Sequence, residues 1–152
     1  MGCVGKGYVT VASSKLSATE NLGVAGVRFE EMSQYVFNWS AAVAKISALK
    51  LAIGECLNDS SGNYTLCDSI SELAKYGILT LPTAENAVIT LIANTAAIQI
   101  AGNAALAGCT FQFQPSVDLP SSGTIRWQPK AIAAVAPSIS VAECSQYVKG
   151  AT

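Results

Sequence analysis

Between residues 29 and 57, an apolar stripe of helical period restricts the folds that are open to this chain. Apolar residues recur at steps of three and four, namely Phe29, Met32, Val36, Trp39, Val43, Ile46, Leu49, Ile53 and Leu57. This spacing is typical of one face of an α-helix, here about 40 Å long at 1.5 Å per residue. We expect Gly54 and the turn-forming cluster at 58–62 to end it. The pattern predicts one long helix whose apolar face needs a partner.

Further along the chain the apolar residues alternate with polar ones. The alternating runs are Ile98–Ile100, Phe111–Phe113 and Ile125–Trp127, and turn-forming residues, Pro115 and Pro129 among them, bound each run. Alternation of this kind predicts antiparallel strands with one buried face and one wet face. The apolar run Val88–Ile92 fits a strand or a helix equally well.

Shorter elements fill the remaining segments. A helix of about two turns is predicted between an N-cap at Asp68 or Ser69 and Gly77. Near the N-terminus, Gly7–Val11 fits a short strand, and Ser13–Gly26 reads as a loop.

The long helix and the sheet each have an apolar face that must be covered. We therefore predict an α+β fold in which a long N-terminal α-helix packs on an antiparallel sheet of about four strands. The 152 residues suffice for one domain. We place that domain at residues 32–152 and treat residues 1–31 as an atypical N-terminal segment.

Composition excludes several classes of function. The chain is 51% hydrophobic and only 12% charged, with a formal net charge of −1 and no histidine. A chain without histidine has no Ser-His-Asp or Cys-His site and no zinc site built on imidazole. The weak net charge gives no strong field toward nucleic acid or acidic lipid. Such a chain is better suited to packing against other molecules than to chemistry, and we do not expect an enzyme.

Five cysteines are present, and none forms a Cys-x-x-Cys pair that would indicate a zinc ribbon or a redox site. Cys56 and Cys67 flank a polar, turn-rich segment, and Cys144 lies close to the C-terminus, where a bridge would hold the chain end. These positions favour disulfides for four of the cysteines over buried free thiols, although four cysteines allow three pairings. The role of Cys3 is left open.

The order of these features resembles the globular part of a bacterial type IV pilin, the repeating subunit of a surface filament. Tyr35-Val36 and the Ala-rich segment from Ala42 to Cys56 are similar to the second half of the family's long first helix. The segment Phe111–Pro115, followed after a loop by Gly123-Thr124-Ile125-Arg126-Trp127, is similar to its paired strands. Cys144 resembles the second cysteine of the family's C-terminal disulfide loop.

Two departures from the family pattern stand out. The family's basic leader, processing site and wholly apolar half-helix are absent, and polar, Gly-containing residues 1–31 stand in their place. We interpret this segment as a replacement for the natural start, or else as part of a genuine pilin-like variant. After Trp127 the chain has Gln128-Pro129 where the family often has the first loop cysteine. The resemblance then implies that Cys109 pairs with Cys144, less firmly than it implies a pair of Cys56 with Cys67.

The resemblance implies a structural role at the surface of a bacterium. The expected function is that of a type IV pilus subunit serving adhesion, twitching motility or DNA uptake, which reaches the outside through the inner membrane as a precursor. Its partners would be other pilin subunits, the assembly machinery, and a host surface or DNA, with no small-molecule substrate and no cofactor. One alternative is a minor pilin or secretion pseudopilin. Another is a non-polymerising secreted adhesin or binding module, which a solvent-exposed aromatic groove would favour.

For the tryptophans, the basic residues and the carboxylates, we favour structural roles over binding or catalytic ones. Trp39 and Trp127 fit carbohydrate stacking, but at helix and strand spacing we favour a place in the core. The basic residues Arg126, Lys130 and Lys149 would make only a small patch for DNA. The carboxylates are spaced for capping and loops, so we predict no catalytic, cofactor-binding or metal-binding residues.

Overall fold

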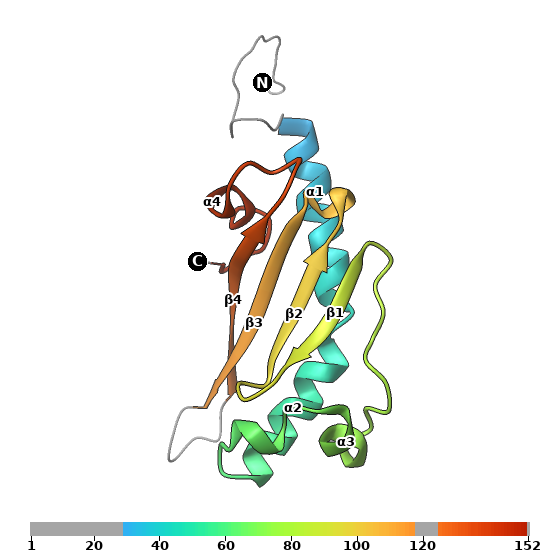
Figure 1. The fold of residues 1–152 in the computed structure, drawn as a ribbon, viewed down its shortest axis with the longest axis vertical. Coiled ribbons are helices and arrows are strands. Elements are labelled where there is room, and N and C mark those ends of the chain that lie inside the picture. The colour runs from blue at the N-terminus through green and yellow to red at the C-terminus, as the bar shows by residue number, and fades with distance from the viewer. Residues whose placement is uncertain (1–28, 118–124, 152) are drawn as a thin grey trace.

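A computed structural model of the protein describes residues 29–117 and 125–151. Two consecutive helices lie along one face of a four-stranded antiparallel sheet, and short helices cap the two ends of this layer pair (Figure 1). The predicted α+β class with a four-stranded antiparallel sheet is confirmed. The expectations for residues 1–28, including the strand at 7–11, lie outside the described residues. Residues 29–31, which we assigned to the atypical segment, are the first residues of the first helix.

The prediction of one long helix is wrong. The stripe forms two helices, α1 (Phe29–Ala44) and α2 (Ser47–Asp59), with a bend of 47° between them. At the junction the N–H groups of Lys45 and Ile46 donate to carbonyls three residues back, and the Ser47 hydroxyl donates to the Ala44 carbonyl oxygen at 3.1 Å. These bonds interrupt the regular helical ladder. Apolar periodicity does not encode them, since Ile46 keeps its place in the stripe and is fully buried.

Gly54 does not end the helix, which continues through it to Asp59. The polar cluster ends it instead, because the N–H of Gly62 donates to the Leu57 carbonyl oxygen at 2.8 Å and Ser61 and Gly62 adopt positive φ. No single helix in the described ranges is long and apolar enough to cross a membrane; α1 and α2 together meet that length and composition across their bend.

One of the short helices was predicted from the sequence, and it lies between Ser69 and Gly77 as expected. Ser69 caps α3 (Ile70–Leu73), which continues as the 3-10 turn η3 (Ala74–Tyr76) and closes at Gly77 with φ 95°. Further one-turn 3-10 elements are η2 (Tyr64–Leu66) and η4 (Ala104–Leu106), and α4 (Val141–Cys144) precedes the C-terminus.

The strands follow one another in the order of the chain. They are β1 (Ala87–Ile92), β2 (Ala97–Gly102), β3 (Cys109–Val117) and β4 (Ile125–Ala134), and each pairs antiparallel with the next. The ambiguous run at 88–92 is therefore a strand.

The two prolines do not bound their strands as expected. Pro115 pairs with Trp127, and Pro129 pairs with Phe113, inside the β3–β4 ladder. Proline is tolerated where its nitrogen needs no ladder partner. Pro129 is on an edge strand, and Pro115 lies beyond Phe113, where the pairing of β3 with β2 ends.

The core lies between the helix pair and the sheet. The rings of Trp39 on α1 and Phe111 on β3 meet edge to face with centroids 4.8 Å apart, and both side chains are fully buried. The Trp39 indole N–H donates to the Leu106 carbonyl oxygen at 2.9 Å. The opposite face of the sheet carries Thr90, Gln99, Gln112 and Lys130 in one cross-strand row. No helix of the described part covers that face (Figure 1).

Candidate functional site

Two disulfides fix the segments that leave the helix–sheet core. Cys56 is bonded to Cys67 across the turn that follows α2, and Cys109 at the start of β3 is bonded to Cys144 in α4. These are the two pairs that the resemblance implies. All four cysteines are buried. The second bridge holds the segment after β4 against the sheet.

The C-terminal segment is also held by a buried carboxylate. Glu143 in α4 is 2% exposed; its Oε1 accepts from the Ile139 N–H at 2.8 Å, and its own N–H donates to the Ser140 hydroxyl at 3.1 Å. The Tyr147 hydroxyl donates to Glu143 Oε2 at 3.4 Å. Burial, and then the charge of Glu143, raise the pKa of Tyr147 to about 12. Tyr147 packs edge to face on Tyr35 of α1, so this cluster joins the chain end to the helix layer.

The helix pair carries a second apolar stripe, which is exposed rather than part of the core. We call it the outer stripe; its members follow steps of four and three and all are exposed: Phe37, Ala41, Ala44, Ala48 and Leu51. Phe37 is 70% exposed and Leu51 is 66% exposed. Three alanines between two large side chains leave a shallow surface on which another helix could pack closely. Single exposed apolar residues are ordinary, whereas a row of them is a candidate interaction surface.

An open groove of about 410 Å³ lies between α2 and the start of β4. On the β4 side, Ile125 lies opposite Gly54, and Trp127 lies beside Ile125. On the α2 side, Lys50 and Leu51 lie one turn before Gly54, and Asn58 lies one turn after it. Ser47 and Glu55 also contribute to the polar lining. We call this feature the α2–β4 groove.

The two tryptophans have different environments. Trp39 is part of the core, as expected. Trp127 packs partly against the core and also lines the α2–β4 groove, so it is only half-buried. The Lys50 ammonium lies 5.8 Å from the Trp127 ring centroid and 5.4 Å from that of Phe113. Burial lowers the pKa of Lys50.

The basic residues considered for DNA lie near one edge of the sheet. Arg126 and Lys130 are exposed on β4 four residues apart, and so they share the uncovered face of the sheet. Lys149 is exposed beside Gly150, whose carbonyl oxygen accepts from the Gln128 Nε2 at 2.7 Å. Three cations thus lie along β4, which is a small number for a nucleic-acid surface.

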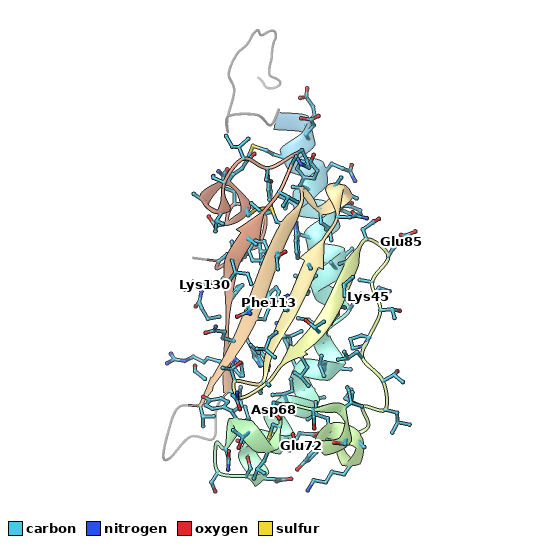
Figure 2. All side chains as sticks on the ribbon, viewed as in Figure 1. Lys45, Asp68, Glu72, Glu85, Phe113 and Lys130 are labelled. Atoms are coloured by element: carbon cyan, nitrogen blue, oxygen red, sulfur yellow. A yellow bond between two sulfur atoms is a disulfide. The ribbon has the colours of Figure 1, made fainter. Side chains whose placement is uncertain are left out.

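The carboxylates of the loops accept hydrogen bonds that hold neighbouring segments together. Figure 2 shows Asp68 and Glu72 together at the end of the molecule where α2 and α3 lie, far from Lys130 on β4. Glu72 accepts from the Asp68 N–H, and Asp68 accepts from the Asn94 N–H. The Asp59 carboxylate accepts from the Tyr76 hydroxyl at 2.7 Å. Among the residues that the structure describes, no three His, Cys, Asp or Glu side chains gather as a metal site.

The outer stripe and the α2–β4 groove are not among the features that the sequence predicts. The predicted apolar stripe leaves out Ala41, Ala44 and Ala48, although their spacing with Phe37 and Leu51 is itself periodic. Gly54 was interpreted as a helix end, although a glycine with a helical pattern on both sides can also mark a close approach. Lys50 gives no signal in the sequence, because its neighbours Phe113 and Trp127 come from distant strands.

Comparisons with models of protein families, with curated proteins and with solved structures find no match to this chain.

Proposed function

We propose that this chain is the globular part of a structural subunit of a type IV pilus, a bacterial surface filament for adhesion, twitching motility or DNA uptake. The observation that carries the proposal is the outer stripe. A helix layer whose inner stripe holds a sheet needs no second apolar row for its own stability, so the exposed row fits packing against neighbouring subunits.

Two further features support this proposal. The order of elements, helices followed by a four-strand meander and a disulfide-tied C-terminal segment, is the order that the resemblance implies. The formal net charge of −1 gives little repulsion between copies. The bend between α1 and α2 departs from an unbroken first helix, so the proposal depends on the outer stripe and the order of elements rather than on helix continuity.

Filament imaging of the chain, joined at its N-terminus to the family's apolar half-helix and expressed in its own host, tests the proposal. We expect filaments from the unmodified globular sequence and none from Phe37→Asp or Leu51→Asp, because a charge in the stripe must be desolvated on packing. Leu79→Asp is the matched control, since Leu79 is 75% exposed but lies in a loop away from the stripe. Folding of each variant is checked by its thermal unfolding.

Absence of filaments from this fusion, under conditions in which it is exported and folded, would contradict the proposal. Filaments of normal length from both stripe variants would also contradict it, because assembly would then use another surface.

A further inference from the structure

The α2–β4 groove exists because Gly54 has no side chain. Gly54 is an interior residue of α2, where glycine costs about 1 kcal/mol relative to alanine. Its backbone is not in the left-handed region, and an added Cβ would come no closer than 3.7 Å to Ile125 Cγ1, an ordinary contact. Among the residues that the structure describes, neither backbone geometry nor packing therefore requires glycine here. A close approach by something outside the described fold would explain it.

Lys50 provides a second, independent observation at the same place. Its ammonium is held by two rings, those of Phe113 and Trp127. No hydrogen-bond acceptor or carboxylate in the described ranges pairs with it, so its N–H donors remain available at the groove. The lowered pKa of Lys50 agrees with this partial loss of water.

The chemistry of the lining indicates the class of ligand. Leu51, Ile125 and Trp127 give the groove an apolar wall, which suits the C–H face of a ring. Lys50 and Asn58 supply donors, and Asn58 and Glu55 supply acceptors, which suits a ring bearing several hydroxyls. One ammonium and one carboxylate leave the groove with no net charge, so a neutral ligand is complementary. The volume of about 410 Å³ lies in the range of small-molecule sites.

We propose that the α2–β4 groove binds one neutral hexose or N-acetylhexosamine unit of a carbohydrate, with Trp127 along its apolar face and Lys50 and Asn58 on its hydroxyls. The groove is open in a single copy of the chain, so this inference stands whether or not the chain assembles into a filament. It gives the molecule a surface for carbohydrate adhesion.

Tryptophan fluorescence tests this site directly, because the chain has two tryptophans and Trp39 is 0% exposed. The full chain is titrated with galactose, glucose, mannose, N-acetylglucosamine and N-acetylgalactosamine at millimolar concentrations. We expect a saturable change of Trp127 emission with at least one of these sugars. In an amide NMR spectrum, the same sugar should shift the signals of Gly54 and the Trp127 indole more than those of Phe37 and Ala41, which lie in the outer stripe away from the groove.

Variants separate binding from folding. Gly54→Leu fills the groove and should abolish the response, while Lys50→Gln should weaken the apparent affinity by about tenfold through loss of a charged donor. Lys75→Gln is the matched control, since the Lys75 ammonium also lies 5.4 Å from a ring, that of Tyr76, but outside the groove. Gly54→Ala shows by its thermal stability that a side chain at this position is tolerated.

Three results would overturn the proposal. The first is unchanged Trp127 emission with all five sugars. The second is a response to acetate or glucuronate but to no neutral sugar, which would indicate an anion site. The third is a Trp127 signal that depends on protein concentration alone, which would place a second copy of the chain in the groove.

Discussion

At the scale of single residues, the two short helices use the same device at their starts. Ser69 with Glu72 and Ser140 with Glu143 repeat a serine followed three residues later by a glutamate. In each pair the glutamate N–H donates to the serine hydroxyl, and the glutamate side chain accepts from the N–H that precedes the serine. This variant of the capping box satisfies donors that a short helix would otherwise leave unpaired. Helices of one turn persist here because of such side-chain bonds.

A matched pair of glycines gives the first prediction at this scale. Gly108 and Gly77 both adopt positive φ, at 68° and 95°. An added Cβ at Gly108 would overlap the carbonyl oxygen of Val135, whereas at Gly77 it would meet nothing within 4 Å. We expect Gly108→Ala to lower the free energy of unfolding by about 3 kcal/mol or more and Gly77→Ala by about 1 kcal/mol. Urea denaturation measures both, and equal losses would contradict the packing argument.

Tyr147 gives a prediction for alkaline pH. Its pKa is about 12 in the folded protein, against an ordinary value of 10. Between these values the unfolded chain releases the phenol proton while the folded chain keeps it. The free energy of unfolding must therefore fall as pH rises from 10 to 12, and the contribution is fully present below pH 10.

We expect Tyr147→Phe to be less stable at pH 8, because Glu143 loses a donor, yet to decline less steeply between pH 10 and 12. Tyr64→Phe, which removes a hydroxyl that accepts from the Val117 N–H, should keep the steeper decline. Urea titrations across this pH range, with Cys3 alkylated, measure the slopes. Equal slopes for the wild type and Tyr147→Phe would show that Tyr147 does not cause the decline.

At the scale of elements, packing against the sheet organises the helices, and disulfides hold the segments that the core does not. The Cys56–Cys67 bridge closes a short loop after α2, with a sequence separation of 11. The Cys109–Cys144 bridge closes a loop that contains β4, with a separation of 35. The two bridges therefore restrict the unfolded chain to different degrees.

Removal of each bridge gives the prediction at this scale. Under the chain-entropy account, replacing Cys56 and Cys67 with alanine should cost about 3 kcal/mol, and replacing Cys109 and Cys144 should cost about 4 kcal/mol. Urea denaturation of the two double variants measures the order. A larger cost for the shorter loop would show that native packing around the cysteines, rather than loop closure, dominates.

At the scale of the whole molecule, the sheet face and the helix face that remain exposed differ in chemistry, although Val88 is exposed among the polar residues of the sheet. One face of the sheet is covered by helices, and the other presents amides, hydroxyls and the β4 cations to solvent. The exposed side of the helix layer presents the outer stripe, whose last member, Leu51, also lines the α2–β4 groove. The filament test with Phe37→Asp and Leu51→Asp addresses that stripe, and the sugar titration addresses the α2–β4 groove. Phe37 belongs only to the stripe and Gly54 only to the groove, and the two readouts differ, so either proposal can fail alone.

Local patterns in the sequence determined the fold class and most of the helices and strands. Periods of three to four and of two distinguish helix from strand because side chains repeat with those periods along the two backbones. Turn residues and caps fixed the short helix between Ser69 and Gly77. The four-stranded antiparallel sheet followed, because an amphipathic helix and half-buried strands must cover one another.

Tertiary structure alone decided the bend between α1 and α2, the passage of β3 and β4 through their prolines, and the α2–β4 groove. The bend depends on hydrogen bonds of residues 45–47 to carbonyls three residues back, which replace the hydrogen bonds of a regular α-helix. The prolines are allowed only because of where neighbouring strands end. The groove brings Gly54 and Lys50 against residues more than seventy positions away. Local sequence patterns carry no direct signal for such distant contacts, because packing, and not periodicity, creates them.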